Sequence, residues 1–311
     1  MELWFTENQT DRMRFSVRIR ETLFRARTPY QDLLVIDTYE YGRMLVLDGM
    51  VMVTDFDEFI YHEMIIHIPM CLHPNPKRVL VIGGGDGGSV REILRHPSVE
   101  RVVLCEIDEE VINASRKFFP ILSKELDNPK VEIIIQDAIE YVKKYSVIAS
   151  EAKQSPTESF DVIIIDSSDP VGPATGLFSL SFFQDVFRCL SPDGVVSAQS
   201  ESPHLHPNRV RGVYRIMKQL FPHAAVYCAP IPTYPTGYWS FTLGSKRKLN
   251  LCSVIASLAP GCDPGEAKQS PLPDWMEARI GALEPQLLYF NRDIQQSAFA
   301  LPTFLRRWLD G

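Results

Sequence analysis

From residue 77 onward, short apolar runs alternate with stretches whose apolar residues recur at helical spacing. An uninterrupted apolar run fits a strand that is buried on both faces, and the amphipathic stretches fit helices that cover those faces. The alternation predicts an α/β fold, with a mostly parallel, Rossmann-like sheet between layers of helices. The apolar runs are KRVLVIGGG (77–85), ERVVLCEID (100–108), KVEIIIQDA (130–138), FDVIIIDSSDP (160–170) and GVVSAQSES (194–202).

The stretches between and after these runs complete the expected sheet domain. AAVYCAPIP (224–232) and YWSFTLGS (238–245) are apolar runs close together, which predicts a final hairpin at the edge of the sheet. The predicted covering helices are SVREILRH (89–96), EEVINASRKFF (109–119), SLSFFQDVFRCL (179–190) and NRVRGVYRIMKQLF (208–221).

The first 62 residues have a different pattern. QDLLVIDTYEYGRMLVLDGMVMVTDFDEF (31–59) contains β-branched and aromatic runs that are broken by YGR and LDGM, as in hairpins. DEFIYHEMIIH (57–67) then reads as the start of an amphipathic helix. We therefore expect a small antiparallel β domain over residues 1–62 and a Rossmann-like domain over residues 63–311.

Two short segments occur twice in the chain. SVIAS stands at 146–150 and 253–257, and EAKQSP stands at 151–156 and 266–271. Their surroundings differ, so they do not mark a repeated fold. We interpret them as one genetic element inserted twice into surface loops, near 146–158 and 253–271, where added length costs little loop entropy.

Charge and composition exclude several classes of protein. The net charge of −7 argues against a nucleic-acid or anionic-membrane partner. No apolar run is long enough to span a membrane, and the N-terminus lacks a secretory segment. The six cysteines form no C-x-x-C pair, so we expect free thiols, a cytoplasmic protein, and neither a disulfide framework nor a metal site.

A glycine-rich loop carries the first candidate chemistry. Within VLVIGGGDGGSV (79–90), Gly83, Gly85 and Gly88 match the G-x-G-x-x-G pattern that cradles a pyrophosphate at a helix N-terminus. Asp86 stands inside this loop, where its charge would repel a phosphate by about 4 kcal/mol at 4 Å and an effective dielectric constant near 20. A ligand with a positive charge fits the loop better than a dinucleotide.

Acidic residues also stand at the ends of the other apolar runs. Ligands of such sheets bind beyond the carboxyl ends of the strands, and an acid about twenty residues after the glycines commonly binds ribose hydroxyls. Like charges gathered at one edge of a sheet are costly unless a cation neutralises them. The acids expected there are Asp86, Glu106, Asp137, Asp166 and Asp169.

These motifs together resemble the spermidine synthase family of aminopropyltransferases. GGGDGG, DSSDPVGPA and YHE are the most specific of them. The resemblance covers most of the chain, apart from the loops with the repeated element and residues 245–285. The matching segments are WFTE (4–7), YQDLLVIDT (30–38), LVLDGMVMVTDFDEFIYHEMIIH (45–67), VIGGGDGG (81–88), CEID (105–108), QDA (136–138), DSSDPVGPA (166–174), PTYPTGYWSF (232–241) and AFALP (298–302).

The resemblance implies a methyltransferase-type fold and a place in polyamine and spermidine biosynthesis. Decarboxylated S-adenosylmethionine is the expected co-substrate, with no further cofactor and no metal. It would give its aminopropyl group to putrescine, which yields spermidine and 5′-methylthioadenosine. The resemblance also implies a homodimer or homotetramer, formed through the β domain. Cadaverine, agmatine and spermidine remain alternative acceptors.

The resemblance assigns two sets of site residues. For the donor, Glu106 would hold the ribose hydroxyls, Asp137 with Ala138 would read the adenine edge, and Asp86 would bind the ammonium group. Asp166 is the candidate base, with Tyr61 and Tyr234 orienting the attacking nitrogen. The full donor set is Gln31, Asp86, Glu106, Asp137, Ala138 and Pro173, and the polyamine set is Tyr61, His62, Asp86, Asp166, Asp169, Glu201, Tyr234 and Trp239.

Three other functions remain open at this stage. A putrescine N-methyltransferase would share the scaffold but would need S-adenosylmethionine, whose carboxylate Asp86 should repel. A polyamine-binding protein without catalysis would keep the acidic slot but show no turnover on any diamine. An NAD-dependent oxidoreductase would bind nicotinamide at the glycine loop.

Overall fold

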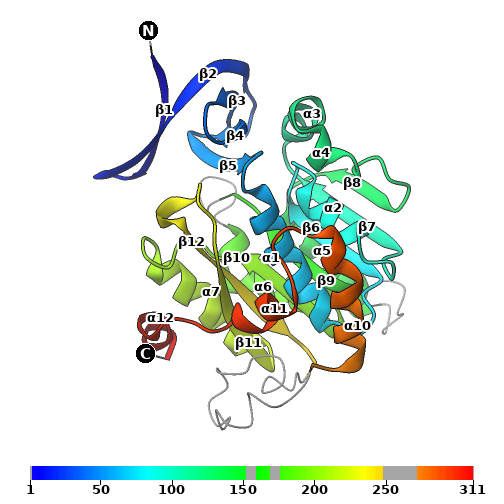
Figure 1. The fold of residues 1–311 in the computed structure, drawn as a ribbon. Coiled ribbons are helices and arrows are strands. Elements are labelled where there is room, and N and C mark those ends of the chain that lie inside the picture. The colour runs from blue at the N-terminus through cyan, green and yellow to red at the C-terminus, as the bar shows by residue number, and fades with distance from the viewer. Residues whose placement is uncertain (1, 152–158, 169–175, 248–271, 311) are drawn as a thin grey trace.

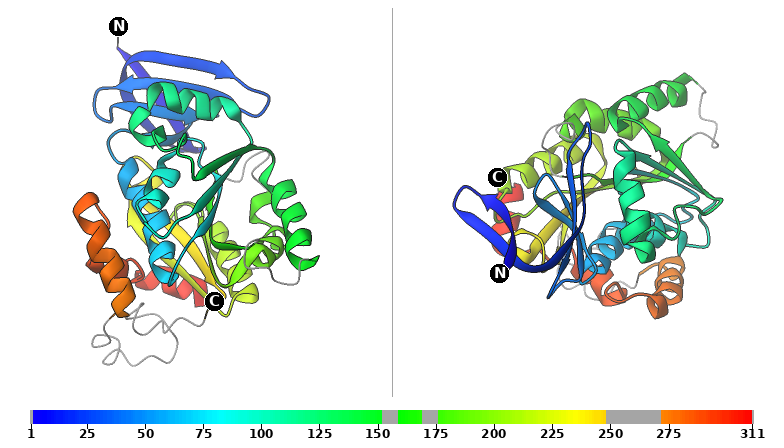
Figure 2. Two further views of the ribbon diagram at one scale, coloured as in Figure 1. Left: turned by 90° about the vertical axis from the view of Figure 1, so that its right-hand side faces the viewer. Right: turned by 90° about the horizontal axis from the view of Figure 1, so that it is seen from above.

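The computed structural model describes residues 2–151, 159–168, 176–247 and 272–310, which form two sheets with helices around the larger one (Figure 1). The smaller sheet is built from the first 54 residues and caps one end of the molecule, as Figure 2 shows. None of the described helices is long and apolar enough to cross a membrane.

The N-terminal sheet is an antiparallel meander of five strands in chain order. Asp48 and Gly49 both have positive φ angles between the last two strands, which is the backbone of a tight hairpin turn and fits the LDGM signal. The strands are β1 (Leu3–Thr10), β2 (Met13–Arg27), β3 (Asp32–Thr38), β4 (Arg43–Leu47) and β5 (Met50–Thr54).

The N-terminal sheet packs on the larger domain through an apolar cluster. Leu33 and Leu45 of this sheet meet Val111 and Phe119 of the segment that contains α3 (Glu109–Phe118) and α4 (Pro120–Ser123). Figure 2 shows these helices directly beneath the sheet. The contact places the inner end of the β domain over the carboxyl ends of the parallel strands.

Helix α1 (Glu58–Leu72) differs from the amphipathic helix that the sequence predicts. All residues from 61 to 72 are buried, including Pro69. The helix packs against the central sheet on one side and α10 (Asp274–Leu283) on the other. A helix buried on all sides must give its polar side chains partners inside the protein. The predicted domain boundary at residue 62 falls within this helix.

The larger sheet has the order β11-β12-β10-β9-β6-β7-β8, with β6 to β10 parallel and the last hairpin antiparallel. The strand order reverses between β6 and β9, which is where ligands bind in open α/β sheets. The predicted α/β class and the final hairpin are confirmed. The strands are β6 (Arg78–Gly83), β7 (Arg101–Glu106), β8 (Val131–Ile135), β9 (Phe160–Asp166), β10 (Leu190–Gln199), β11 (His223–Pro230) and β12 (Tyr238–Ser245).

The two faces of this sheet support separate hydrophobic clusters. Successive residues of β6 face opposite clusters: Val79 belongs to one cluster and Leu80 to the other. One cluster contains α1, α2 and α10, and the other contains α5, α6 and α7. Burial on both faces explains why the strands read as continuous apolar runs. The helices not yet bounded are α2 (Gly88–Leu94), α5 (Ala138–Glu151), α6 (Leu180–Cys189), α7 (Pro207–Leu220), α11 (Arg292–Ser297) and α12 (Thr303–Asp310), with short 3₁₀ turns η2 (Pro235–Gly237) and η3 (Glu284–Gln286).

The first copy of the repeated element corrects one expectation. SVIAS at 146–150 is not a loop, because helix α5 continues through it to Glu151. Ser146 is buried and donates a hydrogen bond to Asp185 of α6, so the segment has a packed face. Residues 152–156 and the entire second copy lie outside the described residues.

Candidate active site

A cavity of about 150 Å³ lies where the β domain meets the carboxyl ends of β6, β7 and β9. A smaller cavity of about 40 Å³ shares its wall at Tyr61, Ser167, Ser168 and Tyr234. The predicted site residues that line the larger cavity are Gln31, Tyr61, His62, Asp86, Glu106, Asp137, Ala138, Asp166 and Tyr234.

The glycines of the loop after β6 make room for neighbouring groups of the protein. Gly83 and Gly84 have positive φ angles, and a Cβ on Gly84 would lie 2.9 Å from Oδ2 of Asp166. A Cβ on Gly88 would lie 2.3 Å from Cε1 of the His62 ring. The glycine pattern is therefore accounted for by close packing against Asp166 and His62, without a bound phosphate.

Glu106, at the end of β7, is held by the backbone. It accepts N–H groups of Gly85, Ile107 and Asp108 at 2.8 to 3.2 Å. Burial raises the pKa of Glu106 to about 7, although these hydrogen bonds act to lower it. Asp137 is fixed similarly, because its Oδ1 accepts the N–H of Ile139 at the start of α5.

Gln31 reaches this side of the cavity from the β domain. Its Nε2 donates to Oδ2 of Asp108 at 2.8 Å, and the hydroxyl of Thr28 donates to the same oxygen. Asp108 also caps helix α3 by accepting the N–H of Glu110. Asp108 was not among the predicted site residues, although its place in the CEID motif gave a signal for it.

Asp166 ends β9 between two hydroxyl donors. The hydroxyls of Tyr61 and Ser89 each donate to one of its oxygens at 2.6 Å. Burial, and then the charge of Asp86, raise the pKa of Asp166. Among the described residues, no cationic side chain pairs with it, so its negative charge is left for a ligand. Ser89 is a second site residue that the sequence analysis missed.

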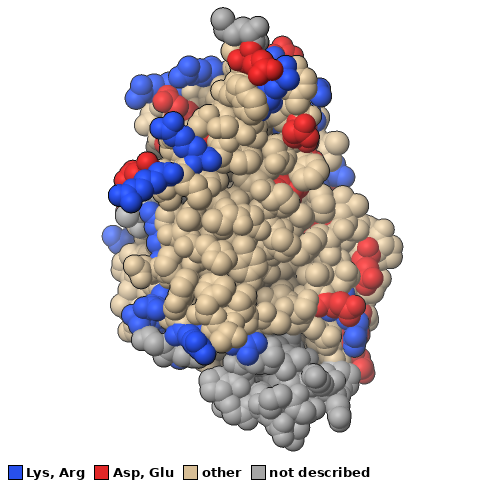
Figure 3. All heavy atoms as spheres, turned by 60° about the vertical axis from the view of Figure 1, so that its left-hand side comes forward, with Lys and Arg blue, Asp and Glu red and all other residues tan. Residues whose placement is uncertain are grey.

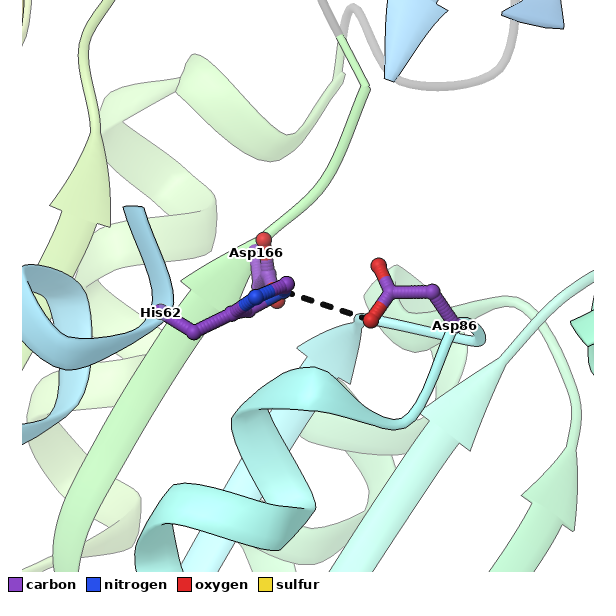
Figure 4. Close-up of side chains that lie close together, drawn as sticks. All are labelled: His62, Asp86 and Asp166. Atoms are coloured by element: carbon purple, nitrogen blue, oxygen red, sulfur yellow. Dashed lines mark ion pairs between the residues drawn. The ribbon is translucent and has the colours of Figure 1, made fainter. Parts of the chain in front are cut away.

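His62 and Asp86 form an ion pair beside Asp166 (Figure 4). Nε2 of His62 lies 3.3 Å from Oδ1 of Asp86, and Nδ1 lies 2.7 Å from Oε2 of Glu58. Burial disfavours the imidazolium, but Asp86 and Glu58 outweigh it and raise the pKa of His62 well above its usual value. Although burial acts to raise the pKa of Asp86, His62 lowers it.

The ion pair of His62 and Asp86 affects two properties of the site: whether it can bind a metal ion, and which carboxylate keeps an unbalanced negative charge. Ligand atoms of His62, Asp86 and Asp166 lie within 4.8 Å of one another. A doubly protonated imidazole has no lone pair for a metal, however, so the group is poorly suited to hold one. His62 also balances the charge of Asp86, which leaves Asp166 as the unbalanced carboxylate.

The smaller cavity adds an acid that the sequence analysis did not find. Glu7 of β1 is 4% exposed, and its Oε2 accepts the N–H of Val51. Trp239 lines the same cavity, lies 4.7 Å from the Tyr234 ring, and has an indole N–H without a partner among the described residues. Glu7 is the one buried position of β1 in the structure.

Two family models match this chain over almost all of the residues that build the two sheets. The model described as "Spermine/spermidine synthase domain" covers residues 58–253, and "Spermidine synthase tetramerisation domain" covers residues 3–55. The chain belongs to the spermine/spermidine synthase family. The resemblance inferred from the motifs is thereby confirmed, and the chain is an enzyme of the polyamine aminopropyltransferase class.

Individual members of the spermine/spermidine synthase family agree with this. A polyamine aminopropyltransferase of Thermoanaerobacter sp. (strain X514) is 45% identical over 310 residues, covering 100% of this chain and 99% of its own. One from Caldicellulosiruptor bescii is 47% identical over 306 residues, covering 98% of each. A spermidine synthase solved with the transition-state analogue AdoDATO superposes with a TM-score of 0.85 at 36% identity, covering 99% of this chain and 95% of that one. Spermidine synthase from Thermotoga maritima gives a TM-score of 0.81 at 35% identity, covering 99% and 94%.

Not every residue predicted from the family motifs reaches the two cavities. Glu201 has a left-handed backbone, and its buried carboxylate is bound by Arg209 and lies near His206. It lines neither cavity, so the geometry does not support its predicted place in the polyamine slot. Asp169 and Pro173 lie outside the described residues.

Proposed function

We propose that the protein transfers the aminopropyl group of decarboxylated S-adenosylmethionine to putrescine, giving spermidine and 5′-methylthioadenosine. The observation that carries this proposal is the pair of adjoining cavities, in which Tyr61 lines both and donates a hydrogen bond to Asp166 in the wall of the larger one. Several carboxylates line the larger cavity and Glu7 lines the smaller one, which suits ligands with cationic groups. Family membership supports the same reaction class.

We assign the larger cavity to the aminopropyl donor. In it, Glu106 binds the two ribose hydroxyls, and Asp137 with Ala138 reads the adenine edge. Gln31, fixed by Asp108, closes the pocket from the β domain. Pro173 stays in this proposal on the family motif alone. The Oδ2 of Asp86, a residue that lines the larger cavity, has no hydrogen-bond partner among the described residues, and in Figure 4 it is the carboxylate oxygen that the ion pair with His62 does not use. It is the oxygen proposed to accept the donor's ammonium group.

We assign the smaller cavity to the amine acceptor, and Tyr61, Tyr234 and Trp239 form part of its wall. The attacking amine faces Tyr61 and, across the boundary with the larger cavity, Asp166. Glu7 binds the far ammonium group of the diamine, because a buried carboxylate at the end of a narrow cavity favours a cation there. Asp169 keeps its proposed place near the amine from the motif. Glu201 is not retained, since Arg209 occupies its carboxylate.

The reaction is a displacement at the methylene beside the sulfonium. The amine nitrogen forms the new C–N bond while the C–S bond breaks and its electron pair goes to sulfur. An alkyl ammonium of pKa about 10.4 must first lose a proton, which costs about 4.6 kcal/mol at pH 7. Asp166 accepts this proton. The raised pKa of Asp166 reduces the difference between its pKa and that of the amine. Tyr61 contributes to the rate by holding the amine in line with the C–S bond.

One acceptor screen tests the proposal. The purified protein is incubated with either decarboxylated S-adenosylmethionine or S-adenosylmethionine and, separately, with putrescine, cadaverine, agmatine or spermidine, and products are identified by mass. We expect putrescine to be used best, as the resemblance to the spermidine synthase family implies. Transfer from S-adenosylmethionine instead would favour an N-methyltransferase and contradict the proposal, as would a lack of turnover with all four amines.

We also propose that the enzyme assembles as a homodimer or homotetramer through the β domain. Five of the nine exposed large hydrophobic side chains among the described residues lie in the first 56 residues, with Trp4 56% and Phe56 53% exposed. Figure 3 shows a broad face without charged side chains at its centre. Light scattering on Trp4→Glu, compared with the wild type, tests this assembly.

The cytoplasm is the proposed compartment, supported by the four free, buried cysteines of the described residues.

A further inference from the structure

Next to the ion pair of His62 and Asp86 lies a second, largely buried one, between Arg91 and Glu58. Both Nη atoms of Arg91 donate to the carboxylate of Glu58, each at 2.9 Å. The side chains of Arg91 and Glu58 are 6% and 10% exposed. Neither residue was assigned a role by the family motifs, and Glu58 and Arg91 do not line either cavity.

The Arg91 guanidinium is itself fixed on its other edge. Its Nε donates to Oε1 of Glu92 at 2.7 Å, and the other carboxylate oxygen of Glu92 lies 3.1 Å from Nε2 of the buried His67. Bidentate pairing of this kind fixes direction as well as charge. The oxygen that Glu58 presents to His62 is therefore held in place from behind.

The geometry around the His62 ring determines its protonation state. Nδ1 faces Oε2 of Glu58 and Nε2 faces Oδ1 of Asp86. Ionised carboxylate oxygens only accept hydrogen bonds, so both ring nitrogens must carry a proton. Arg91 keeps Glu58 ionised, and the N–H of Gly88 at 2.6 Å favours the ionised form of Asp86.

The ring also has no space in which to turn away. A Cβ on Gly88 would lie within 2.5 Å of both ring nitrogens, so the backbone of α2 already touches one face of the ring. The ring of Tyr61 meets it edge-on, with centroids 5.3 Å apart. The charged and titratable groups that face His62 are Glu58 from α1, Asp86 from the glycine loop, Arg91 from α2, Asp166 from β9 and Tyr61 from α1.

We propose that Glu58 and Arg91 are positioning residues that hold His62 as a fixed imidazolium. This cation balances Asp86 and leaves Asp166 unbalanced, so the attacking amine gives its proton to Asp166 and not to Asp86. The inference rests on the proposed function for its consequence in the reaction. Its structural core, the charge of His62, does not depend on which acceptor is used.

The directions of the pKa shifts agree with this arrangement. Burial acts to raise the pKa of Glu58, but His62 and Arg91 outweigh it, and the net shift is downward. The pKa of His62 is raised, so its imidazolium persists above the usual titration range near 6.5.

The test is an NMR titration of the His62 ring in the unliganded protein, with its signal assigned by loss in His62→Gln. We expect the imidazolium signal throughout pH 6–8.5 in the wild type. In Glu58→Gln, we expect the midpoint to fall by at least one pH unit, a tenfold loss of proton affinity, into that range. A wild-type ring that is neutral at pH 7, or an unchanged midpoint in Glu58→Gln, would overturn the proposal.

A matched control separates positioning from general loss of stability. Glu63 is on the same helix and is more deeply buried than Glu58, but its carboxylate accepts backbone N–H groups of residues 288–290. Glu63→Gln is expected to lower the melting temperature and leave the His62 midpoint unchanged. A shift of the midpoint by Glu63→Gln as large as that by Glu58→Gln would contradict a specific role for Glu58.

Kinetics add a second readout. In Glu58→Gln, kcat/KM for the amine should decline as pH rises through the lowered His62 midpoint, with methylthioadenosine affinity unchanged. The double variant Glu58→Gln/His62→Gln should be no worse than His62→Gln alone, because Glu58 acts through His62. Additive losses would refute this. If the wild type transfers no aminopropyl group at all, the proposed function fails, while the titration still decides the charge of His62.

Discussion

The two halves of the site hold their carboxylates in different ways. On the nucleoside side, Glu106 and Asp137 accept hydrogen bonds from backbone N–H groups, mostly within two residues along the chain. On the acceptor side, Asp166 is held by Tyr61 and Ser89, which are 105 and 77 residues away. One half is set by local turns and helix starts, and the other by the assembly of three separate elements.

This difference has a chemical consequence. Backbone donors around Glu106 are fixed in position and carry no titratable partner. The acceptor half is instead a set of coupled side chains, in which the charge of His62 affects Asp86, and that of Asp86 affects Asp166. Substitutions on the acceptor side should therefore change proton chemistry, whereas those on the nucleoside side should change ligand affinity.

Asp166→Asn should give the largest effect. The amide keeps the shape of the side chain but cannot take the proton of the amine, so kcat should fall by about 10²–10⁴-fold, the usual contribution of a general base. Melting temperature and methylthioadenosine affinity should stay close to wild type, because Glu106 and Asp137 are untouched. Near-normal turnover in a steady-state assay would remove Asp166 from the base role.

Gly88→Ala should break the acceptor half sterically. The new Cβ would lie 2.3 Å from the His62 ring, which has no space to retreat, and overpacking of this kind costs about 1–3 kcal/mol in the free energy of unfolding. We expect a lower kcat/KM for the amine together with this loss of stability, measured by kinetics and denaturant unfolding.

Gly212→Ala is the control for that substitution. Gly212 lies within helix α7, where a Cβ would meet nothing within 4 Å. Alanine there should stabilise the protein by about 0.5–1 kcal/mol and leave the kinetics unchanged. If Gly88→Ala left stability and kinetics as Gly212→Ala does, our inference that the glycine loop packs tightly against the His62 ring would be wrong.

The same local and non-local division explains what the sequence could predict. The strands of the larger sheet and the helices predicted at 89–96, 109–119, 179–190 and 208–221 follow from patterns within their own residues, whereas α5 was missed; the place of Glu106 after the glycines is likewise a local signal. Ser89 and Glu7 could not be assigned, because their contacts join segments far apart in the chain. Glu201 was assigned to the polyamine slot by the family resemblance, and its pairing with Arg209 of α7 could not be read from its own segment.

The smallest predicted effect concerns the nucleoside half and its pH dependence. The pKa of Glu106 is raised from 4.5 to about 7 in the unliganded protein, chiefly by burial. Ribose hydroxyls donate to its ionised form, so methylthioadenosine should lower this pKa and release up to one proton near pH 7. Affinity should rise with pH up to about 7, by at most tenfold per unit, and level off above it.

Calorimetry in two buffers of different ionisation enthalpy measures that proton, and Glu106→Gln should abolish its release. Glu106 also changes the free energy of unfolding with pH, in the direction opposite to that of an acid whose pKa is lowered by a salt bridge. Because the folded state favours protonated Glu106, its contribution to the free energy of unfolding declines as pH rises from 4.5 through about 7. Proton uptake on binding, or an affinity that falls across this range, would mean that neutral Glu106 holds the ribose. That result would contradict the role that we propose for the ionised carboxylate of Glu106 in binding the ribose hydroxyls.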